Sequence, residues 1–273
     1  MPELPEVETV KETLKKKILN QKIIEIKILC PEIIEYPDIL TFKKEIINQT
    51  IIDVKRRGKW LIFELNDYYL LSHLRMEGKY NIKTNESINK HEHIIFYFKD
   101  FNLRYQDTRK FGRMYLYKKE EAFNNKPLNT LGYEPWDNKL NSNYLKEKYK
   151  KITKPIKETL LDQSIIVGIG NIYADEILYL SKINPYEKPS SLNDDKLNNI
   201  IKNTKYVLEE AIKKGGTTIK TFTSSEGVHG RFQQELLVHN QKYCKECNSK
   251  IELVRIGGRS TYYCPNCQKK CQK

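Results

Sequence analysis

The sequence has no hydrophobic run long enough to cross a bilayer. The longest apolar stretches, such as SIIVGIGNIY at 164–173, fall well short of the roughly 20 residues that a membrane-spanning helix needs. The first residues also lack the positively charged start and the apolar run that are typical of a secretory signal. We therefore expect a soluble, cytoplasmic protein with no membrane partner.

Cysteine is scarce outside one segment, and acidic residues are too few to balance the basic ones. Cys30 stands alone, whereas the other five cysteines lie within 244–271, unlike the spread of a secreted disulfide scaffold. The chain has 48 basic and 35 acidic residues, and its net charge is +13. This charge favours a polyanionic partner such as nucleic acid or an anionic membrane surface, although a generally lysine-rich composition would produce the same excess.

The periodicity of the first half predicts a helix followed by many short strands. Within 6–19 the apolar residues Val7, Val10, Leu14 and Ile18 share one helical face. Short runs rich in β-branched and aromatic residues then follow as far as about residue 117, and they predict a β-sandwich or barrel. The runs cover 22–29, 50–57, 60–65, 68–74, 93–98, 102–107 and 113–117.

The pattern changes after LGYEPW at 131–136, where Gly and Pro indicate a boundary. Helices are expected at 155–166, 171–181 and 194–214, and the Gly/Ser/Thr-rich stretch 215–232 is expected to be a mobile loop. The predicted class is therefore α+β. The expected domains are an N-terminal domain at 1–133, a helical domain at 134–238 and a cysteine-rich segment at 239–273.

The C-terminal cysteines form two C-x2-C pairs with sixteen residues between them. Cys244 and Cys247, with Cys264 and Cys267, have the spacing of a tetrahedral four-cysteine zinc site. Four protein ligands would make one Zn²⁺ structural, holding a β-hairpin with its turn at Gly257-Gly258. Two disulfides are the alternative, and Cys271 is interpreted as a spare thiol. The segment 239–273 has eight basic and two acidic residues, which favours nucleic-acid binding over a generic solvated ribbon.

The chain starts MPELPEVETV, and Pro2 and Glu3 allow two interpretations. Removal of Met1 would leave a secondary amine on Pro2, and α-amino groups titrate near about 8, so that part of it would be neutral and nucleophilic. Glu3 could then act as a general acid on a sugar. The alternative is that Pro2 and Pro5 start a helix whose dipole Glu3 and Glu6 complement.

Six motifs in register give the chain a resemblance to a known family. They are MPELPEVETV, RRGKWL at 56–61, SHLRMEG at 72–78, DTRKFGR at 107–113, GIGNIYADE at 168–176 and GGRSTYYCPNC at 257–267. Over essentially its entire length the chain resembles formamidopyrimidine-DNA glycosylase. This family of bifunctional DNA glycosylases and abasic-site lyases repairs oxidised purines such as 8-oxoguanine and formamidopyrimidines.

The resemblance implies an N-terminal β-sandwich, a helix–two-turn–helix domain and a zinc-finger hairpin. It also implies the catalytic residues. Pro2 is the nucleophile that forms an iminium, and Glu3 is the acid. Lys59 acts in the β- and δ-elimination steps, and Arg259 in the finger grips the phosphates beside the lesion.

The resemblance further implies which residues bind double-stranded damaged DNA. Met76, Arg109 and Phe111 fill the space left by the flipped base. Met76 and Phe111 have the apolar side chains of wedges, and Arg109 is a hydrogen-bond donor. Without the resemblance, Met76 would be expected in the core and Arg109 on the surface. A further set of positions is implied for DNA contact: His91, Asn171 and Lys157.

One of these positions, Asn171, allows a second interpretation. Asn171 opens a helix whose exposed amides would bind phosphate, although Gly168 and Gly170 could simply permit a tight turn. The loop 215–230 matches the segment that closes over the flipped base. The protein is expected to be a monomer that associates with the nucleoid through DNA.

Two alternatives come from related or different classes. Endonuclease VIII, for oxidised pyrimidines, shares the Pro–Glu start, but PELPEVE and the trio Met76, Arg109 and Phe111 favour the purine enzyme. A non-enzymatic zinc-finger DNA-binding protein would fit the charge and the cysteines, but it leaves Pro2, Glu3 and Lys59 without a role.

Overall fold

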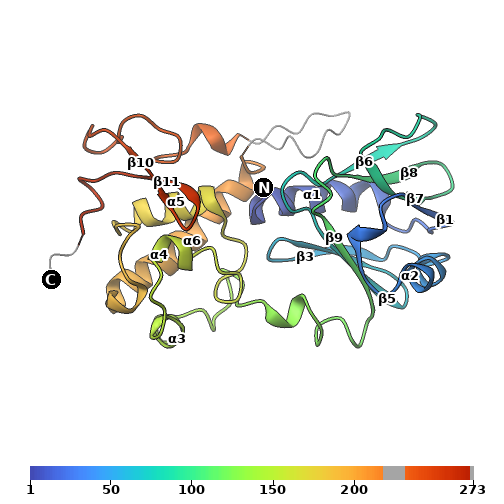
Figure 1. The fold of residues 1–273 in the computed structure, drawn as a ribbon, viewed down its shortest axis with the longest axis horizontal. Coiled ribbons are helices and arrows are strands. Elements are labelled where there is room, and N and C mark those ends of the chain that lie inside the picture. Colours follow the sequence, from blue (N-terminus) through green and yellow to red (C-terminus); the bar gives the residue numbers. More distant parts are fainter. Residues whose placement is uncertain (218–230, 271–273) are drawn as a thin grey trace. The chain divides into compact units, whose positions relative to one another are not determined.

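The computed structural model describes residues 1–217 and 231–270, which fall into two compact units (Figure 1). Residues 1–130 form the first unit, and 131–217 with 231–270 form the second. The unit boundary therefore lies close to the predicted one. The separation of a zinc finger at residue 239 stays a prediction, because that segment belongs to the second unit. Cys271 and most of the expected mobile loop lie outside the described residues.

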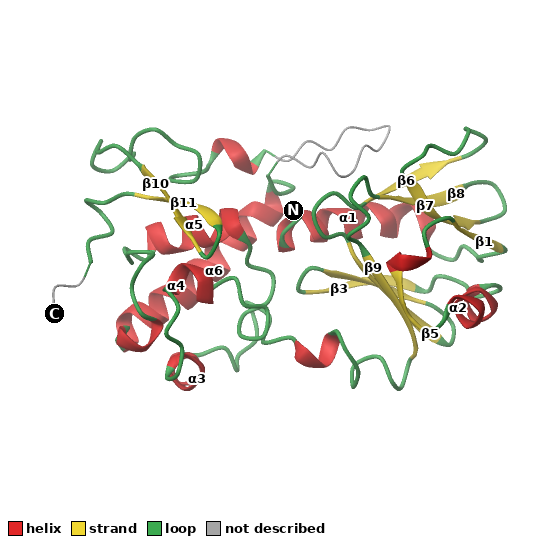
Figure 2. Ribbon diagram, viewed as in Figure 1, coloured by secondary structure: helices red, strands yellow, loops and turns green. Residues whose placement is uncertain are grey.

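Two β-sheets make up most of the first unit (Figure 2). The four-stranded sheet has the order β1-β7-β8-β6 and is antiparallel throughout; the five-stranded sheet has the order β2-β9-β5-β4-β3, with only β2 and β9 parallel. The strands are β1 Glu25–Ile28, β2 Ile34–Tyr36, β3 Asp53–Arg57, β4 Trp60–Glu64, β5 Tyr68–His73, β6 Lys79–Lys83, β7 Glu92–Tyr97, β8 Asn102–Gln106 and β9 Arg113–Lys118.

All seven predicted strands are present, but the first is shorter than expected and two were missed. Residues 22–24 stay outside β1 because Lys22 and Ile23 pair with the segment 49–50 instead. β2 is only three residues long, and β6 has the mixed sequence KYNIK, so neither shows the clear alternation of a half-buried strand.

One apolar core lies in this unit, and both sheets, α1 (Leu4–Ile18) and α2 (Ile39–Ile46) contribute to it. Phe63 of β4 meets Tyr80 of β6 edge to face at 5.6 Å, and the Tyr80 hydroxyl donates to Ser72 Oγ of β5 at 2.7 Å. These contacts join the two sheets, as the predicted sandwich requires. The buried face of α1 includes Val7, Val10, Leu14 and Ile18, as their spacing predicted.

The second unit is helical and ends in a hairpin. Its helices are α3 Ser142–Tyr149, α4 Ile156–Thr159, α5 Asn171–Leu180 and α6 Asp194–Lys213, and its strands are β10 Glu252–Ile256 and β11 Arg259–Tyr263. Short 3₁₀ helices in the two units cover Pro31–Ile33, Leu128–Thr130, Pro189–Ser191 and Phe232–Gln234. The hairpin turns at Gly257 and Gly258, whose φ angles of 54° and 76° fit a two-residue turn.

The helix expected at 155–166 is wrong in length, because α4 ends at Thr159. In the segment that follows, side chains form hydrogen bonds with backbone groups and replace the backbone hydrogen bonds of a continued helix. Asp162 Oδ1 accepts from the backbone N–H of Ser164 at 2.8 Å and from its hydroxyl at 2.7 Å. Gln163 accepts from the Gly168 N–H at 2.8 Å and donates to two carbonyl groups.

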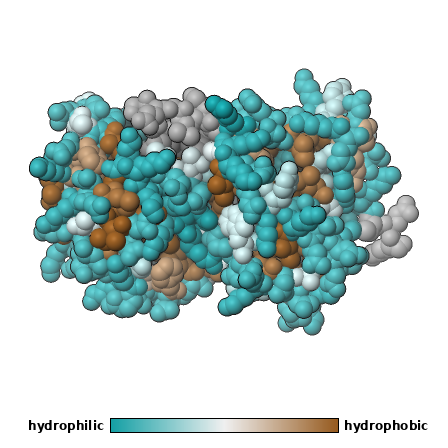
Figure 3. All heavy atoms as spheres, turned by 180° about the vertical axis from the view of Figure 1, so that it is seen from behind, coloured by the Kyte–Doolittle hydropathy of each residue, from teal (hydrophilic) through white to brown (hydrophobic). Residues whose placement is uncertain are grey.

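The face of the molecule drawn in Figure 3 is largely hydrophilic. On this face, hydrophobic side chains gather only in small patches among polar ones. Among the described residues, no helix combines the length and the apolar character that crossing a membrane requires.

Candidate functional site

The N-terminal motif lies at the start of α1. Pro2 is buried, and Glu3 is 3% exposed and directly precedes the helix. The backbone N–H of Glu3 donates to Glu6 Oε2 at 2.9 Å, which is the geometry of a capping box. The helix-start interpretation is therefore correct as a description of local structure. The start of the helix also fixes the positions of Pro2 and Glu3, the two residues for which chemistry was predicted.

Lys59 lies in the tight turn between β3 and β4, and it is only 5% exposed. Gly58 before it has a φ of 56°, a conformation that favours glycine. Arg56 ties this turn to α1, because its Nη1 donates to the Gly58 carbonyl at 2.9 Å and its Nε to Glu8 Oε2 at 2.8 Å. The turn that carries Lys59 is thus connected to the helix that carries Pro2 and Glu3.

His73 lies beside this turn at the end of β5 and is 8% exposed. Its Nδ1 accepts from the Arg75 N–H at 2.9 Å, and its ring meets Trp60 edge to face at 4.7 Å. Burial, followed by the positive charges of Arg75 and Lys59, lowers the pKa of His73 to about 3. The ring is therefore neutral near pH 7.

Two loops carry the three residues predicted to enter the DNA stack. Met76 lies between β5 and β6, and Arg109 and Phe111 lie between β8 and β9. Strands β5 and β9 are paired, with His73 opposite Arg113, so the two loops emerge next to each other. Met76 is 41% and Phe111 45% exposed, and Arg109 is also exposed, so all three side chains are accessible to a partner.

Both loops pack against one hydroxyl group in the core. A Cβ added to Gly78 would lie 2.3 Å from the Tyr105 hydroxyl oxygen, and one added to Gly112 would lie 1.8 Å from it. Only glycine allows this approach. Tyr105 is fully buried. The two loops that carry the predicted trio are therefore seated on the same buried side chain.

Asp107 organises the second loop from beneath. This residue is fully buried, and its carboxylate accepts from the Arg109 N–H at 3.0 Å and from the Gly112 N–H at 2.8 Å. The Tyr105 hydroxyl donates to it at 3.3 Å. Above this support, the Arg109 guanidinium lies 4.6 Å from the centre of the Phe111 ring.

His91 ends the long loop between β6 and β7 and is partly exposed. Its carbonyl accepts from the Asp107 N–H at 3.0 Å. The loop of His91 thus contacts the loop of Arg109 and Phe111. In the first unit, the predicted residues therefore come from the start of α1, one turn and three loops.

In the second unit, Asn171 begins α5 and connects it to the hairpin. Its Nδ2 donates to the Ser260 carbonyl of β11 at 2.8 Å. One of its two amide hydrogens is therefore engaged within the protein. Arg259, the first residue of β11, is exposed, and it lines a cleft of about 520 Å³ together with Lys151 and Lys154.

Lys157 departs from its predicted role. The side chain is fully buried; its Nζ forms an ion pair with Asp175 and donates to the Asn171 carbonyl at 2.7 Å. A buried ammonium group needs such partners and cannot reach a phosphate from this position. The structure therefore corrects the expected direct contact: Lys157 supports the start of α5 from within.

Two acidic residues of α5 hold the segment that leads to the hairpin. Asp175 accepts from His239 Nδ1 at 2.6 Å and from the Tyr262 N–H of β11 at 3.2 Å. Glu176 accepts the backbone N–H groups of residues 237, 238 and 239 at 2.8–3.0 Å. Burial raises the pKa of Glu176 despite these hydrogen bonds.

The four predicted metal ligands form one cluster. The sulfur atoms of Cys244, Cys247, Cys264 and Cys267 all lie within 4.8 Å of one another. The Cys244–Cys267 separation is 3.7 Å and the Cys247–Cys264 separation 3.4 Å, too long for disulfides, and the cysteines are free. Sulfur atoms about 2.3 Å from a tetrahedral zinc would be about 3.8 Å apart, so the donor set fits a bound metal ion.

Ionisation of the four thiols would favour a bound cation. The Ser249 side chain lowers the pKa of Cys247 to about 5, whereas burial and the neighbouring thiols raise the pKa of Cys267. The four thiolates that a zinc site needs can therefore coexist only around a positive ion, and zinc is the usual ion for such a set.

Several supporting residues were not predicted. Arg56 and Asp107 lie inside motifs that were noted, but periodicity does not show that they bind neighbouring backbone. Asp175 of α5 is a charged residue within the largely apolar segment NIYADEILYL, which was the one available signal that it has buried partners. Arg104 lies in the mixed sequence NLRYQ of β8, which carries no such signal.

Three family models match the chain in sequence order. They are the formamidopyrimidine-DNA glycosylase N-terminal domain over residues 1–114, the H2TH domain of the same glycosylase over 131–223, and a zinc finger found in FPG and IleRS over 242–270. Two curated relatives are both named formamidopyrimidine-DNA glycosylase. The one from Oceanobacillus iheyensis is 46% identical and covers 98% of each chain; the one from Shouchella clausii is 44% identical and covers 98% of this chain and 99% of its own.

Solved structures of the Lactococcus lactis protein are also similar over nearly all of the chain. A mutant FPG in complex with a Fapy-dG-containing DNA has a TM-score of 0.92 at 39% identity, and Fpg in complex with an abasic-site-containing DNA has 0.91 at 38% identity. In both cases 98% of this chain and 100% of the other are covered.

Proposed function

Because the chain belongs to the formamidopyrimidine-DNA glycosylase family of DNA repair enzymes, we propose that it excises oxidised purines from duplex DNA and then cuts the abasic site. The proposed substrates are 8-oxoguanine and formamidopyrimidines. The observation that best supports this proposal is the pair of loops seated on Tyr105, which present Met76, Arg109 and Phe111 as one exposed group. Apolar wedges beside a hydrogen-bond donor suit an enzyme that extrudes a base and fills its place.

In the proposed reaction, Pro2 attacks the sugar of the damaged nucleotide. Removal of Met1 frees the secondary amine; with Met1 attached, the nitrogen is an amide and is not nucleophilic. The amine bonds to C1′ and the bond from C1′ to the base breaks, with the amine proton passing to the departing base. The nitrogen lone pair then opens the bond from C1′ to the ring oxygen, which Glu3 protonates. The result is an iminium between Pro2 and C1′.

The iminium then drives strand cleavage. It withdraws electrons from C2′, so a proton leaves C2′ and the bond from C3′ to its phosphate oxygen breaks in a β-elimination. Loss of a second proton, from C4′, breaks the bond from C5′ to its phosphate oxygen in a δ-elimination, and water releases Pro2. Lys59, held on its turn by Arg56, is proposed to assist these eliminations and to neutralise phosphate.

The remaining contacts are proposed to hold the DNA backbone. Arg259 on the hairpin, Asn171 at the start of α5 and His91 on the β6–β7 loop would bind phosphate or the groove. The net charge of +13 adds attraction that does not depend on sequence. A metal ion, proposed to be a single zinc, would hold the hairpin of Arg259 through the four cysteines and take no part in bond breaking. The protein is proposed to act as a monomer.

Borohydride trapping on duplexes tests this proposal directly. The protein would be incubated with a duplex that carries one 8-oxoguanine opposite cytosine, and the cross-linked peptide would be mapped. We expect a cross-link at Pro2 and cleavage on both sides of the lesion. Pro2→Gly should keep DNA affinity but excise the base much more slowly, and Pro5→Gly in the same helix start serves as the matched control.

The outcomes separate the alternatives. Tight binding without a cross-link, in protein whose mass shows that Met1 is absent, would refute the iminium mechanism and favour a DNA-binding protein. Faster excision from a duplex with an oxidised pyrimidine would assign the activity of endonuclease VIII instead.

A further inference from the structure

The loop between β6 and β7, residues 84–91, has little apolar anchoring of its own. Residues 84–90 are all exposed, and the only large aliphatic side chain among them, Ile88, is 37% exposed. A surface loop of this length without buried apolar groups is expected to sample many conformations. This loop nevertheless carries His91, which the proposed function places near DNA. Something other than hydrophobic packing must hold it.

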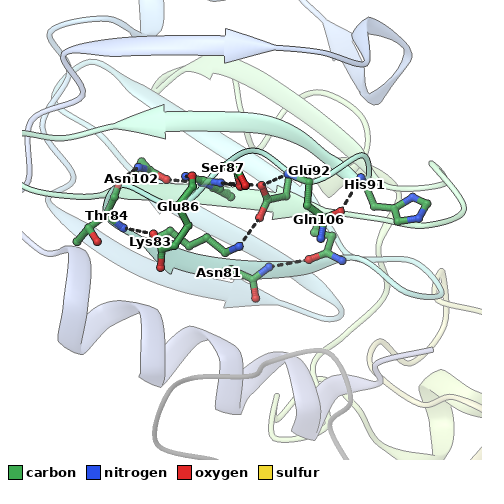
Figure 4. Close-up of polar contacts among 11 residues, drawn as sticks. Asn81, Lys83, Thr84, Glu86, Ser87, His91, Glu92, Asn102 and Gln106 are labelled. Atoms are coloured by element: carbon green, nitrogen blue, oxygen red, sulfur yellow. Dashed lines mark hydrogen bonds and ion pairs between the residues drawn. The ribbon is translucent and has the colours of Figure 1, made fainter.

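Beneath the loop, the outer face of the four-stranded sheet carries a buried polar cluster (Figure 4). Along β8, Leu103 and Tyr105 point into the core, so Asn102, Arg104 and Gln106 point to the other face. Arg104 is only 3% exposed, an unusual environment for an arginine on an outward strand face.

The Arg104 guanidinium binds both the sheet and the loop. Nη1 donates to Glu92 Oε2 at 2.8 Å and to the Ser87 carbonyl at 3.1 Å, and Nη2 donates to the Glu86 carbonyl at 2.6 Å. Nε donates to Asn102 Oδ1 at 2.5 Å. The planar group therefore joins two side chains of the sheet to two backbone carbonyls of the loop, a geometry that lysine cannot reproduce.

Glu92 and Asn102 extend the same support to both ends of the loop. Asn102 Nδ2 donates to the Thr84 carbonyl at 2.9 Å. Glu92 Oε2 accepts from the Asn89 N–H at 2.9 Å, and Asn89 Oδ1 in turn accepts from the His91 N–H at 2.9 Å. Hydrogen bonds thus run without interruption from Arg104 to the backbone of His91.

The charges of the cluster are matched. Glu92 is 1% exposed, and Lys83 Nζ lies 3.1 Å from its Oε1. Burial opposes ionisation of Glu92, but the hydrogen bonds from Asn89, Arg104 and Lys83 outweigh it and lower its pKa. The carboxylate therefore stays charged opposite the guanidinium. Removing Glu92 would leave the buried guanidinium without its counterion, and removing Arg104 would leave the carboxylate with Lys83 as its cationic partner.

We propose that Arg104, paired with Glu92, is a positioning residue for DNA binding, holding the loop 84–91 so that His91 is presented to the DNA. The proposal rests on the proposed function for the role of His91, but the ordering of the loop can be measured without DNA. Arg104 is the residue that donates to both the Glu86 and the Ser87 carbonyl groups of the loop.

The first measurement is amide hydrogen exchange in the free protein. Arg104→Lys keeps the charge but loses the fork of donors, so the amides of residues 84–91 should exchange about tenfold faster or more. Asn102→Ala removes one loop contact with less disturbance and should give a smaller increase. Lys119→Met is the matched control, because it removes an ion pair with Glu64 in the other sheet and should leave this loop unchanged.

The second measurement is affinity for a duplex with an uncleavable tetrahydrofuran abasic-site analogue. His91→Ala and Arg104→Lys should each weaken binding, and the double variant should bind no more weakly than the weaker single variant. This lack of additivity is the result that a merely structural role for Arg104 would not produce, because independent losses multiply.

Each contrary outcome has a defined meaning. Unchanged exchange in both Arg104→Lys and Asn102→Ala would overturn the ordering of the loop. Faster exchange with unchanged affinity, or with multiplied losses in the double variant, would overturn the positioning role. If wild-type protein failed to bind the duplex at all, the proposed function would fall, while the exchange data would still decide whether Arg104 orders the loop.

Discussion

Replacing Asp107 with alanine should disorder the loop that carries Arg109 and Phe111. The buried carboxylate accepts two backbone N–H groups, at 3.0 and 2.8 Å, and one hydroxyl group at 3.3 Å. Hydrogen bonds to a charged group contribute about 1.5–3 kcal/mol each. Loss of the desolvation cost of the carboxylate offsets part of this sum. We therefore expect Asp107→Ala to lower the free energy of unfolding by about 2–4 kcal/mol.

Two further variants make this prediction sharp. Asp107→Asn keeps one acceptor but turns an amide group toward an N–H donor, so its loss of stability should be smaller, about 1–3 kcal/mol. Asp100→Ala removes an exposed carboxylate from the turn between β7 and β8, and it should change stability very little.

Urea denaturation gives the free energy of unfolding, and affinity for a lesion-containing duplex reports on the loop. Both should fall in the order wild type, Asp107→Asn, Asp107→Ala. If Asp107→Ala were as stable as Asp100→Ala and bound the lesion as tightly as wild type, the structural role assigned to this carboxylate would be refuted.

Two further predictions concern acid stability and the metal. His73 has a folded-state pKa of about 3, below the unfolded value of about 6.5, so the unfolded chain binds a proton that the folded protein does not. The free energy of unfolding should therefore fall as the pH decreases from about 6.5 toward 3, by up to about 1.4 kcal/mol per pH unit from this group. In urea titrations, His73→Gln should show a correspondingly smaller dependence of this free energy on pH. An equal dependence in the two proteins would contradict the assignment. Cys244→Ser should lose bound metal by elemental analysis and lose DNA affinity with it, whereas Cys30→Ser, which is not one of the four clustered cysteines, should keep both. Full activity after complete metal removal would show that the hairpin does not need the ion.

Features that depend on neighbouring residues were predictable from the sequence. The two C-x2-C pairs and Gly257-Gly258 specify tight turns. The hairpin and the four-cysteine cluster were therefore predictable from the spacing of these residues. The apolar face of α1 followed from its period. The resemblance in six motifs then implied catalytic and DNA-binding roles for single residues, which no local sequence pattern predicts.

The length of α4 and the position of Lys157 could not be predicted in this way. A helix from 155 to 166 agrees with local propensity, but Asp162 and Gln163 bind the backbone nearby and end it. Lys157 looks like any surface lysine in sequence, yet the fold buries it against Asp175, eighteen residues further along the chain.

The amino-acid sequence alone therefore determined which chemical groups the protein has: a proline and a glutamate at its start, apolar wedges, basic residues and four thiols. Tertiary structure decided which of them act together. Tyr105 seats two separate loops, Asp107 shapes one of them, and Arg104 holds a third. The Tyr105 and Arg104 contacts join residues that are distant along the chain, and the Asp107 contacts form within one loop. Their geometry depends on sheet pairing and burial, which the spacing along a single chain does not encode.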